Sequence, residues 1–224
     1  MSAMAKQIAH VRERLQLAAE RVKRDDEIEL LAVTKTVPIQ TIAEAFSLGL
    51  RSFGESRVQE ALPKIECFRQ ADWHFLGQLQ TNKVKDVVGR FTLIHSLDRW
   101  NLAVALQEQA QKMGQTVRVL VQVNIGKEVQ KGGVYPEDLQ DFLIKAASLS
   151  RLRIEGLMAV PPASENAQDA RPFFREMGRL FRETRVAGVE MNVLSMGMSN
   201  DYEVAVEEGA TLVRVGSVLF GERL

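Results

Sequence analysis

The sequence is short of several features that would define other kinds of protein. It has a single cysteine, Cys67, which excludes an intramolecular disulfide and a cysteine-rich zinc site and fits a reducing compartment such as the cytoplasm. Lys and Arg number 29 and Asp and Glu number 29, so the formal net charge is zero. This balance argues against nucleic acid as a partner, because phosphate backbones are bound by clustered positive charge.

Long apolar stretches are missing as well. The longest apolar runs fall well short of the roughly 20 residues that a membrane helix needs. The N-terminal stretch 1–24 carries charges at Lys6, Arg12, Glu13 and Arg14, and it lacks the apolar core and small-residue cleavage site of a signal peptide. We therefore expect no membrane segment and a cytoplasmic protein.

What the sequence does contain is a repeated unit of a short apolar run followed by a stretch with helical periodicity. Such alternation predicts a parallel sheet whose strands are joined by helical crossovers. The clearest helical stretches are 99–113, 136–149 and 170–185, and the shortest are 82–88 and 202–208. The eight predicted strands are Ile28–Val33, Arg51–Gly54, Trp73–Gly77, Leu93–Leu97, Val117–Ile125, Leu152–Val160, Val193–Met198 and Leu212–Phe220.

Eight parallel strands in a chain of 224 residues favour a closed (β/α)8 TIM barrel. The main rival is an open doubly wound sheet, but the Gly-x-Gly-x-x-Gly fingerprint of dinucleotide-binding sheets does not follow the first run. We predict one barrel domain over residues 1–224. An additional N-terminal helix within 1–24 would pack on the barrel through a stripe formed by Ile8, Val11, Leu15, Ala18 and Val22.

In such a barrel, functional side chains lie at the carboxyl ends of the strands. Lys35 ends the first run, where burial would lower the pKa of its amine and make it a nucleophile able to form a Schiff base. The alternative is a lysine that reaches out of the barrel mouth or pairs with a carboxylate such as Glu55.

Two further strand ends predict an anion site. Gly197-Met198-Ser199 ends the seventh run and Gly216-Ser217 lies in the eighth, and glycine N–H groups with serine hydroxyls at these two positions often bind phosphate in barrels. Arg214 interrupts the eighth run and is expected to face a polar interior, unless it forms a structural ion pair. For His74 and His95 we favour hydrogen-bonded structural roles over acid–base roles.

A lysine, an anion cradle and an arginine together suggest pyridoxal 5'-phosphate (PLP) as ligand. The aldehyde would take the lysine, the phosphate would take the Gly/Ser loops, and the arginine would face the pyridine nitrogen.

The segments that carry these residues resemble the YggS/PROSC family of PLP homeostasis proteins. The resemblance implies a barrel of PLP fold type III, like the N-terminal domain of alanine racemase, with the Schiff base at Lys35. It also implies that Ser199, Gly216 and Ser217 hold the phosphate, beside Gly197 and Met198, and that Arg214 faces the ring nitrogen. The similar segments are 31–35, 53–55, 58–60, 73–83, 154–158, 194–199 and 213–217.

The chain also departs from the family pattern. Ser56 stands where the family has an asparagine near the cofactor, and Gln78 stands where the family has a proline. Lys131 matches a family lysine near the barrel mouth, so it and Lys83 are candidates to capture PLP if Lys35 is removed.

An arginine can only donate hydrogen bonds, so it would leave the pyridine nitrogen unprotonated and the ring a weak electron sink. We also expect no room for the second domain that supplies an acid–base group in alanine racemases. The sequence therefore predicts a monomeric PLP carrier that stores, buffers or delivers the cofactor to PLP-dependent apo-enzymes without turnover. Two alternatives remain: a racemase-like PLP enzyme, and a Schiff-base aldolase in which Lys35 acts on a phosphorylated sugar.

Overall fold

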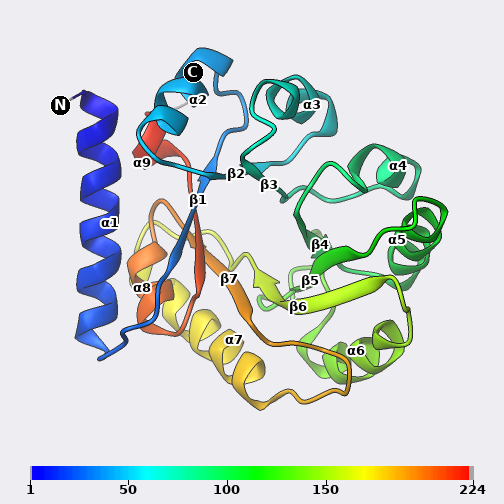
Figure 1. Ribbon diagram of the computed structural model, residues 1–224. Helices are drawn as coiled ribbons and strands as arrows, with labels where there is room; N and C mark the ends of the chain where they lie inside the picture. Colours follow the sequence, from blue (N-terminus) through cyan, green and yellow to red (C-terminus); the bar gives the residue numbers. More distant parts are fainter. Residues whose placement is uncertain (1, 222–224) are drawn as a thin grey trace.

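The computed structural model describes residues 2–221. Its strands pair in sequence order into a closed parallel barrel (Figure 1). Closure is made by the last strand against the first, with Arg214 opposite Leu31, which confirms the predicted barrel and excludes the open sheet. The strands are β1 Glu29–Val33, β2 Ser52–Glu55, β3 Asp72–Phe75, β4 Leu93–Leu97, β5 Val117–Val123, β6 Leu152–Ala159, β7 Val193–Met198 and β8 Leu212–Val215.

Helical segments follow each strand and surround the barrel (Figure 1). Those at the five stretches predicted from periodicity begin and end within three residues of the prediction. The segments are α2 Ile39–Ser47, α3 Val58–Cys67, η1 Thr81–Lys83, α4 Val84–Val87, α5 Trp100–Lys112, η2 Pro136–Asp138, α6 Leu139–Ala147, η3 Ala167–Ala170, α7 Arg171–Glu183, α8 Tyr202–Glu207 and α9 Ser217–Phe220.

The eighth apolar run was predicted wrongly as one strand over Leu212–Phe220. The strand ends at Val215 and the helix α9 begins at Ser217. Gly216 makes the change of direction, with φ −126° and ψ −72°. A short apolar run fits a strand and a buried helical turn equally well, and here the second half buries Leu219 as a helical turn.

Two kinds of side chain fill the barrel. Leu93, Leu120 and Met158 form a small apolar cluster separate from the main core between sheet and helices. Buried polar side chains of β3, β4, β7 and β8 lie beside that cluster: His74, His95, Ser195 and Arg214. The interior is therefore polar on one side, which is unusual for a barrel whose centre is normally packed with branched aliphatic residues.

The helix α1 Ala3–Arg21 lies outside the barrel against α8 and α9 (Figure 1). Its predicted stripe is buried at Ile8, Val11, Leu15 and Ala18, because these positions recur on one helical face. The fifth predicted member, Val22, was wrong, because the helix ends at Arg21 and Val22 is exposed. None of the helices built from the described residues has the length and apolarity needed to cross a membrane.

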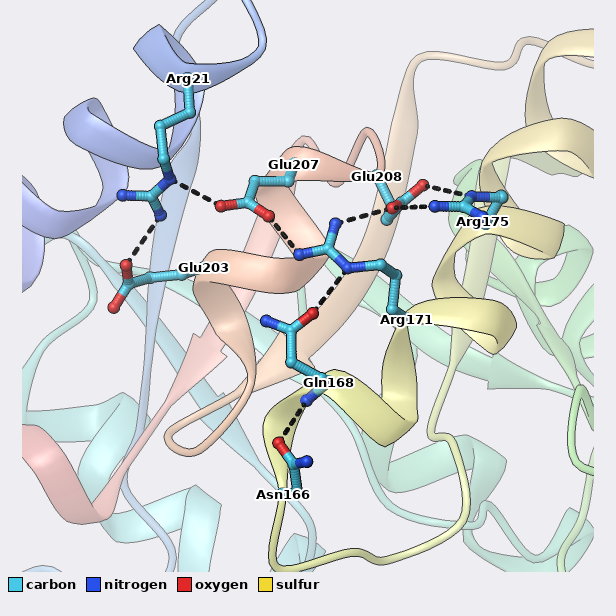
Figure 2. Close-up of polar contacts among 8 residues, drawn as sticks. All are labelled: Arg21, Asn166, Gln168, Arg171, Arg175, Glu203, Glu207 and Glu208. Atoms are coloured by element: carbon cyan, nitrogen blue, oxygen red, sulfur yellow. Dashed lines mark hydrogen bonds and ion pairs between the residues drawn. The ribbon is translucent and has the colours of Figure 1, made fainter.

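An ion-pair network fastens α1 to α8 and α8 to α7 (Figure 2). Arg21 contacts Glu203 at 2.9 Å and Glu207 at 2.7 Å. Glu207 also contacts Arg171 at 2.5 Å, and Arg171 reaches Glu208 at 2.8 Å. Because α8 directly follows the loop after β7, the network supports the loop that carries Ser199.

Candidate functional site

A cavity of about 570 Å³ opens at the carboxyl ends of the strands. It is lined by residues at or after the ends of seven strands, all except β4, and it brings together seven of the eight predicted site residues. Gly197 does not line it, and neither does Lys83. The predicted residues on the cavity are Lys35, Ser56, Met198, Ser199, Arg214, Gly216 and Ser217, and Lys131 joins them. A larger cavity of about 970 Å³ lies at the opposite end of the barrel, beside Glu29.

The β1 end that carries Lys35 is fixed by α3. Lys64 of α3 donates to the main-chain oxygen of Thr34 at 2.7 Å. Thr36 adopts a left-handed φ of 63°, and its N–H donates to Glu60 of α3 at 3.1 Å, which holds the pKa of Glu60 below its usual value. Lys35 itself is exposed at the mouth, so the expected burial of its amine was wrong.

The Glu55 carboxylate accepts hydrogen bonds from two buried donors. Its Oε1 accepts from Lys64 at 2.7 Å and from the Thr34 hydroxyl at 2.6 Å, and Glu55 and Lys64 are both buried. The carboxylate therefore serves to anchor α3 on the end of β1. This cluster was not found in the sequence, because a lysine on a helix is ordinarily a solvated residue.

The predicted anion cradle is held together by its own residues. The Ser199 hydroxyl accepts from the N–H of Gly216 at 3.2 Å, which ties the loop after β7 to the end of β8. Asp201 accepts from the N–H of Met198 at 2.6 Å, and burial raises the pKa of Asp201. Ser217 is exposed at the start of α9, so hydroxyl and N–H donors converge on one wall of the cavity.

Gly197 contributes to this wall indirectly. Its φ is +89°, and a Cβ at this position would lie 2.5 Å from the Cβ of Ala205 in α8. Glycine is therefore required for α8 to pack closely on β7, and Gly197 places Ser199 without lining the cavity.

Arg214 of β8 is buried and lines the cavity, and the acceptors of its hydrogen bonds are neutral. It donates to the Ser195 hydroxyl at 2.7 Å and to the main-chain oxygen of Ala159 at 2.8 Å. Burial lowers the pKa of Arg214 to about 10, so the group remains charged at neutral pH. Within residues 2–221 no carboxylate forms an ion pair with it, so the alternative of a structural ion pair is not observed. With five N–H donors on a guanidinium, Arg214 has donors left for a ligand.

His74 and His95 are buried in the barrel below Arg214 and are hydrogen-bonded, as the sequence favoured. Nδ1 of His74 lies 3.1 Å from Nε2 of His95, and Nδ1 of His95 lies 3.0 Å from Oγ of Ser195. Burial lowers the pKa of His74 to about 3 and the pKa of His95 well below its ordinary value. Both rings are neutral at pH 7, so neither acts as a titrating acid.

The loop after β6 forms another wall of the cavity. Pro161, Pro162 and Ser164 line the cavity there. Lys131 donates to the main-chain oxygen of Pro161 at 3.0 Å and pairs with Glu128, so it closes the mouth from the side of β5. The position of this loop, directly after a predicted strand, was the signal that could have assigned it to the site.

Ser56 stands at the end of β2 on the cavity. A Cβ on Gly77 would lie 2.1 Å from the main-chain oxygen of Ser56, so glycine is required where the β3 loop passes this residue. The close contact fixes the backbone of Ser56 while its hydroxyl remains available to the cavity.

Comparison with known proteins identifies the family. Residues 7–224 match the model of the alanine racemase N-terminal domain. A pyridoxal phosphate homeostasis protein of Aquifex aeolicus is 48% identical over 220 residues, covering 96% of both chains, and one of Escherichia coli is 39% identical over 230 residues, covering 100% of this chain and 98% of its own. PipY of Synechococcus elongatus, solved with PLP bound, is 34% identical with a TM-score of 0.83, over 97% of this chain and 100% of that chain.

The barrel and its site thus define a protein of the alanine racemase N-terminal domain class. Within that class, the chain belongs to the family of pyridoxal phosphate homeostasis proteins.

Proposed function

We propose that this chain binds PLP in the cavity at the carboxyl ends of its barrel and takes part in intracellular PLP homeostasis. The observation that carries the proposal is the meeting of Lys35, Arg214 and the Ser199–Gly216 pair on one cavity of about 570 Å³. The bound cofactor in PipY and the names of the two relatives support the same ligand.

The residues of the cavity fit this cofactor group by group. Lys35 supplies a primary amine for a Schiff base with the aldehyde. The Ser199 and Ser217 hydroxyls would supply neutral donors for the phosphate, with Gly216 holding Ser199 in place through its N–H. Val33, Leu76 and Met158 would supply an apolar wall for the ring. Arg214 supplies a charged N–H donor for the pyridine nitrogen. When bound, PLP would supply an electrophilic aldehyde and an aromatic ring able to withdraw electrons.

Storage rather than turnover is favoured by the donor facing the ring. Arg214 is charged and can only donate, so toward a bound PLP it would keep the pyridine nitrogen unprotonated and weaken electron withdrawal by the ring. The cavity residues supply no histidine or tyrosine in the described part of the chain. Both features work against a racemase-like activity, in which a placed acid–base group must move a proton.

We further propose a monomeric cytoplasmic protein that passes PLP to apo-enzymes. The barrel is closed, so the sheet has no free edge to pair with a second chain. The one cysteine, Cys67, is a free and exposed thiol, which suits a reducing compartment. Exposure of Lys35 at the mouth allows an acceptor to reach the bound aldehyde.

Absorption spectroscopy tests the proposal. We expect the purified protein to bind PLP with a visible band that borohydride removes, leaving the label on the Lys35 peptide. Lys35→Ala should abolish that band, whereas Lys83→Ala, away from the cavity, should retain it. A protein that stays colourless after addition of PLP would overturn the proposal and favour the aldolase.

Incubation with amino acids tests the absence of turnover. We expect no racemisation or transamination by the loaded protein. Measurable turnover that is lost in Lys35→Ala would contradict the carrier function while leaving PLP binding intact.

A further inference from the structure

The polar side of the barrel interior forms a continuous chain of hydrogen bonds. It starts at Arg214, passes through the Ser195 hydroxyl and His95, and ends at His74. The four residues come from β8, β7, β4 and β3, and all are buried. The chain thus runs from the ligand cavity to the opposite end of the barrel, where Nε2 of His74 lies 3.9 Å from the carboxylate of Glu29.

The chemistry of the donors gives this chain a single direction. Arg214 can only donate, so Ser195 Oγ accepts from it at 2.7 Å. The hydrogen of this buried hydroxyl also needs an acceptor, and the other contact of Ser195 Oγ among the described residues is Nδ1 of His95 at 3.0 Å. A neutral imidazole that accepts at Nδ1 carries its proton at Nε2. His95 therefore donates from Nε2 to Nδ1 of His74 at 3.1 Å.

The same reasoning fixes the second ring. His74 accepts at Nδ1, so its proton is at Nε2, on the side of Glu29. Every bond then points from the arginine to the carboxylate. The negative ends of the dipoles face the buried guanidinium, and the last N–H faces the carboxylate of Glu29. The charges at the two ends therefore both favour this direction of the chain.

We infer that Ser195, His95 and His74 are positioning residues for Arg214. Their chain of hydrogen bonds, here called the relay, has one fixed direction and holds the guanidinium oriented toward the ligand. The inference rests on the proposed function for its effect on PLP, but the direction of the relay belongs to the protein alone. The relay stabilises the buried positive charge of Arg214 with neutral groups. A carboxylate in their place would compete with the ligand for the N–H donors of Arg214.

Nuclear magnetic resonance of the ¹⁵N-histidine-labelled protein without PLP tests the direction. The chain has three histidines, so His→Gln variants assign all signals. We expect His74 and His95 both to carry the proton at Nε2 and to stay neutral between pH 5 and 8, with the exposed His10 as the third assigned signal. A proton on Nδ1 of His95, or titration of either buried ring in this range, would overturn the relay whatever the protein binds.

The effect on PLP is tested with Ser195→Ala, which removes the link between Arg214 and His95. We expect roughly tenfold weaker PLP binding, because one hydrogen bond to a charged group is lost, and a changed pH dependence of the visible band, because the donor to the ring nitrogen is no longer fixed. Ser195→Thr retains the hydroxyl and should restore both properties.

Ser96→Ala is the matched control. Ser96 is also fully buried in β4, but its hydroxyl has no hydrogen-bond partner among the described residues. We expect the control to bind PLP as the parent protein does. If the parent fails to bind PLP, the proposed function fails; if the parent binds and Ser195→Ala matches it in affinity and spectrum, the positioning role fails.

Discussion

The ammonium of Lys64 donates to the main-chain oxygen of Thr34 at 2.7 Å, one residue before Lys35. The same ammonium pairs with the fully buried Glu55. One helical lysine therefore both neutralises a core carboxylate and holds the end of the strand that carries Lys35.

We predict that Lys64→Met lowers the free energy of unfolding by about 3 to 5 kcal/mol, because it leaves the Glu55 carboxylate buried and unpaired. Adding Glu55→Gln should recover most of the loss, since an amide is uncharged and still accepts from Thr34. Urea unfolding measures both variants. The exposed Lys85 provides the control, and a Lys64→Met variant as stable as Lys85→Met would contradict the role of the pair.

The strand ends could be predicted from the sequence, because each strand is a local apolar pattern and the barrel rule places its carboxyl end at the site. Lys35, Ser199 and Arg214 were found in that way. The sequence did not show where Leu212–Phe220 changes from strand to helix, since both conformations bury a short apolar run.

The contacts among the supporting residues could not be predicted, because their partners are distant in the sequence. His74, His95, Ser195 and Arg214 come from four strands, and only closure of the barrel brings them together. Lys64 is a similar case, since it pairs across the sheet surface with residues of β1 and β2.

Gly197 offers a test of packing between β7 and α8. Alanine there would place a Cβ 2.5 Å from Ala205 at a φ of +89°, so we predict a loss of about 3 kcal/mol or more from combined backbone strain and overpacking. Gly49→Ala is the control, with φ +92° and open space around the Cβ; it should cost only about 1 kcal/mol. Thermal unfolding compares the two, and equal losses would show that packing against α8 has no part.

The two buried histidines should make the folding stability of the protein sensitive to acid. The folded-state pKa of His74 is lowered to about 3 by burial, and that of His95 is also well below its usual value, so the unfolded chain binds more protons below about pH 6.5. Stability is therefore complete above that pH and falls as the pH decreases toward the folded pKa. The charges that face these rings are Glu29, Arg118 and Arg214.

From pH 7 to 5.5 we expect His74 to contribute a loss of about 1.3 kcal/mol through the linkage of protonation to unfolding, and His95 to add a loss of the same sign. His74→Gln should remove the His74 contribution and leave that of His95, with His10→Gln, at an exposed position, as the control. Urea unfolding at several pH values measures this, and a stability that is flat over this range would contradict neutral buried rings.

Lys131 is the expected site of residual PLP capture when Lys35 is absent. Lys131 lines the cavity and its ammonium is held at the mouth by Pro161 and Glu128, whereas Lys83 lies in η1 away from the cavity. A phosphate bound by the Ser199 and Gly216 wall would still bring the aldehyde within reach of a lysine at the cavity mouth.

In Lys35→Ala we therefore predict that borohydride fixes a reduced amount of PLP on the Lys131 peptide, detected by mass spectrometry. The double variant Lys35→Ala/Lys131→Ala should lose this label and Lys35→Ala/Lys83→Ala should keep it; label on Lys83 would show capture at the surface rather than in the cavity.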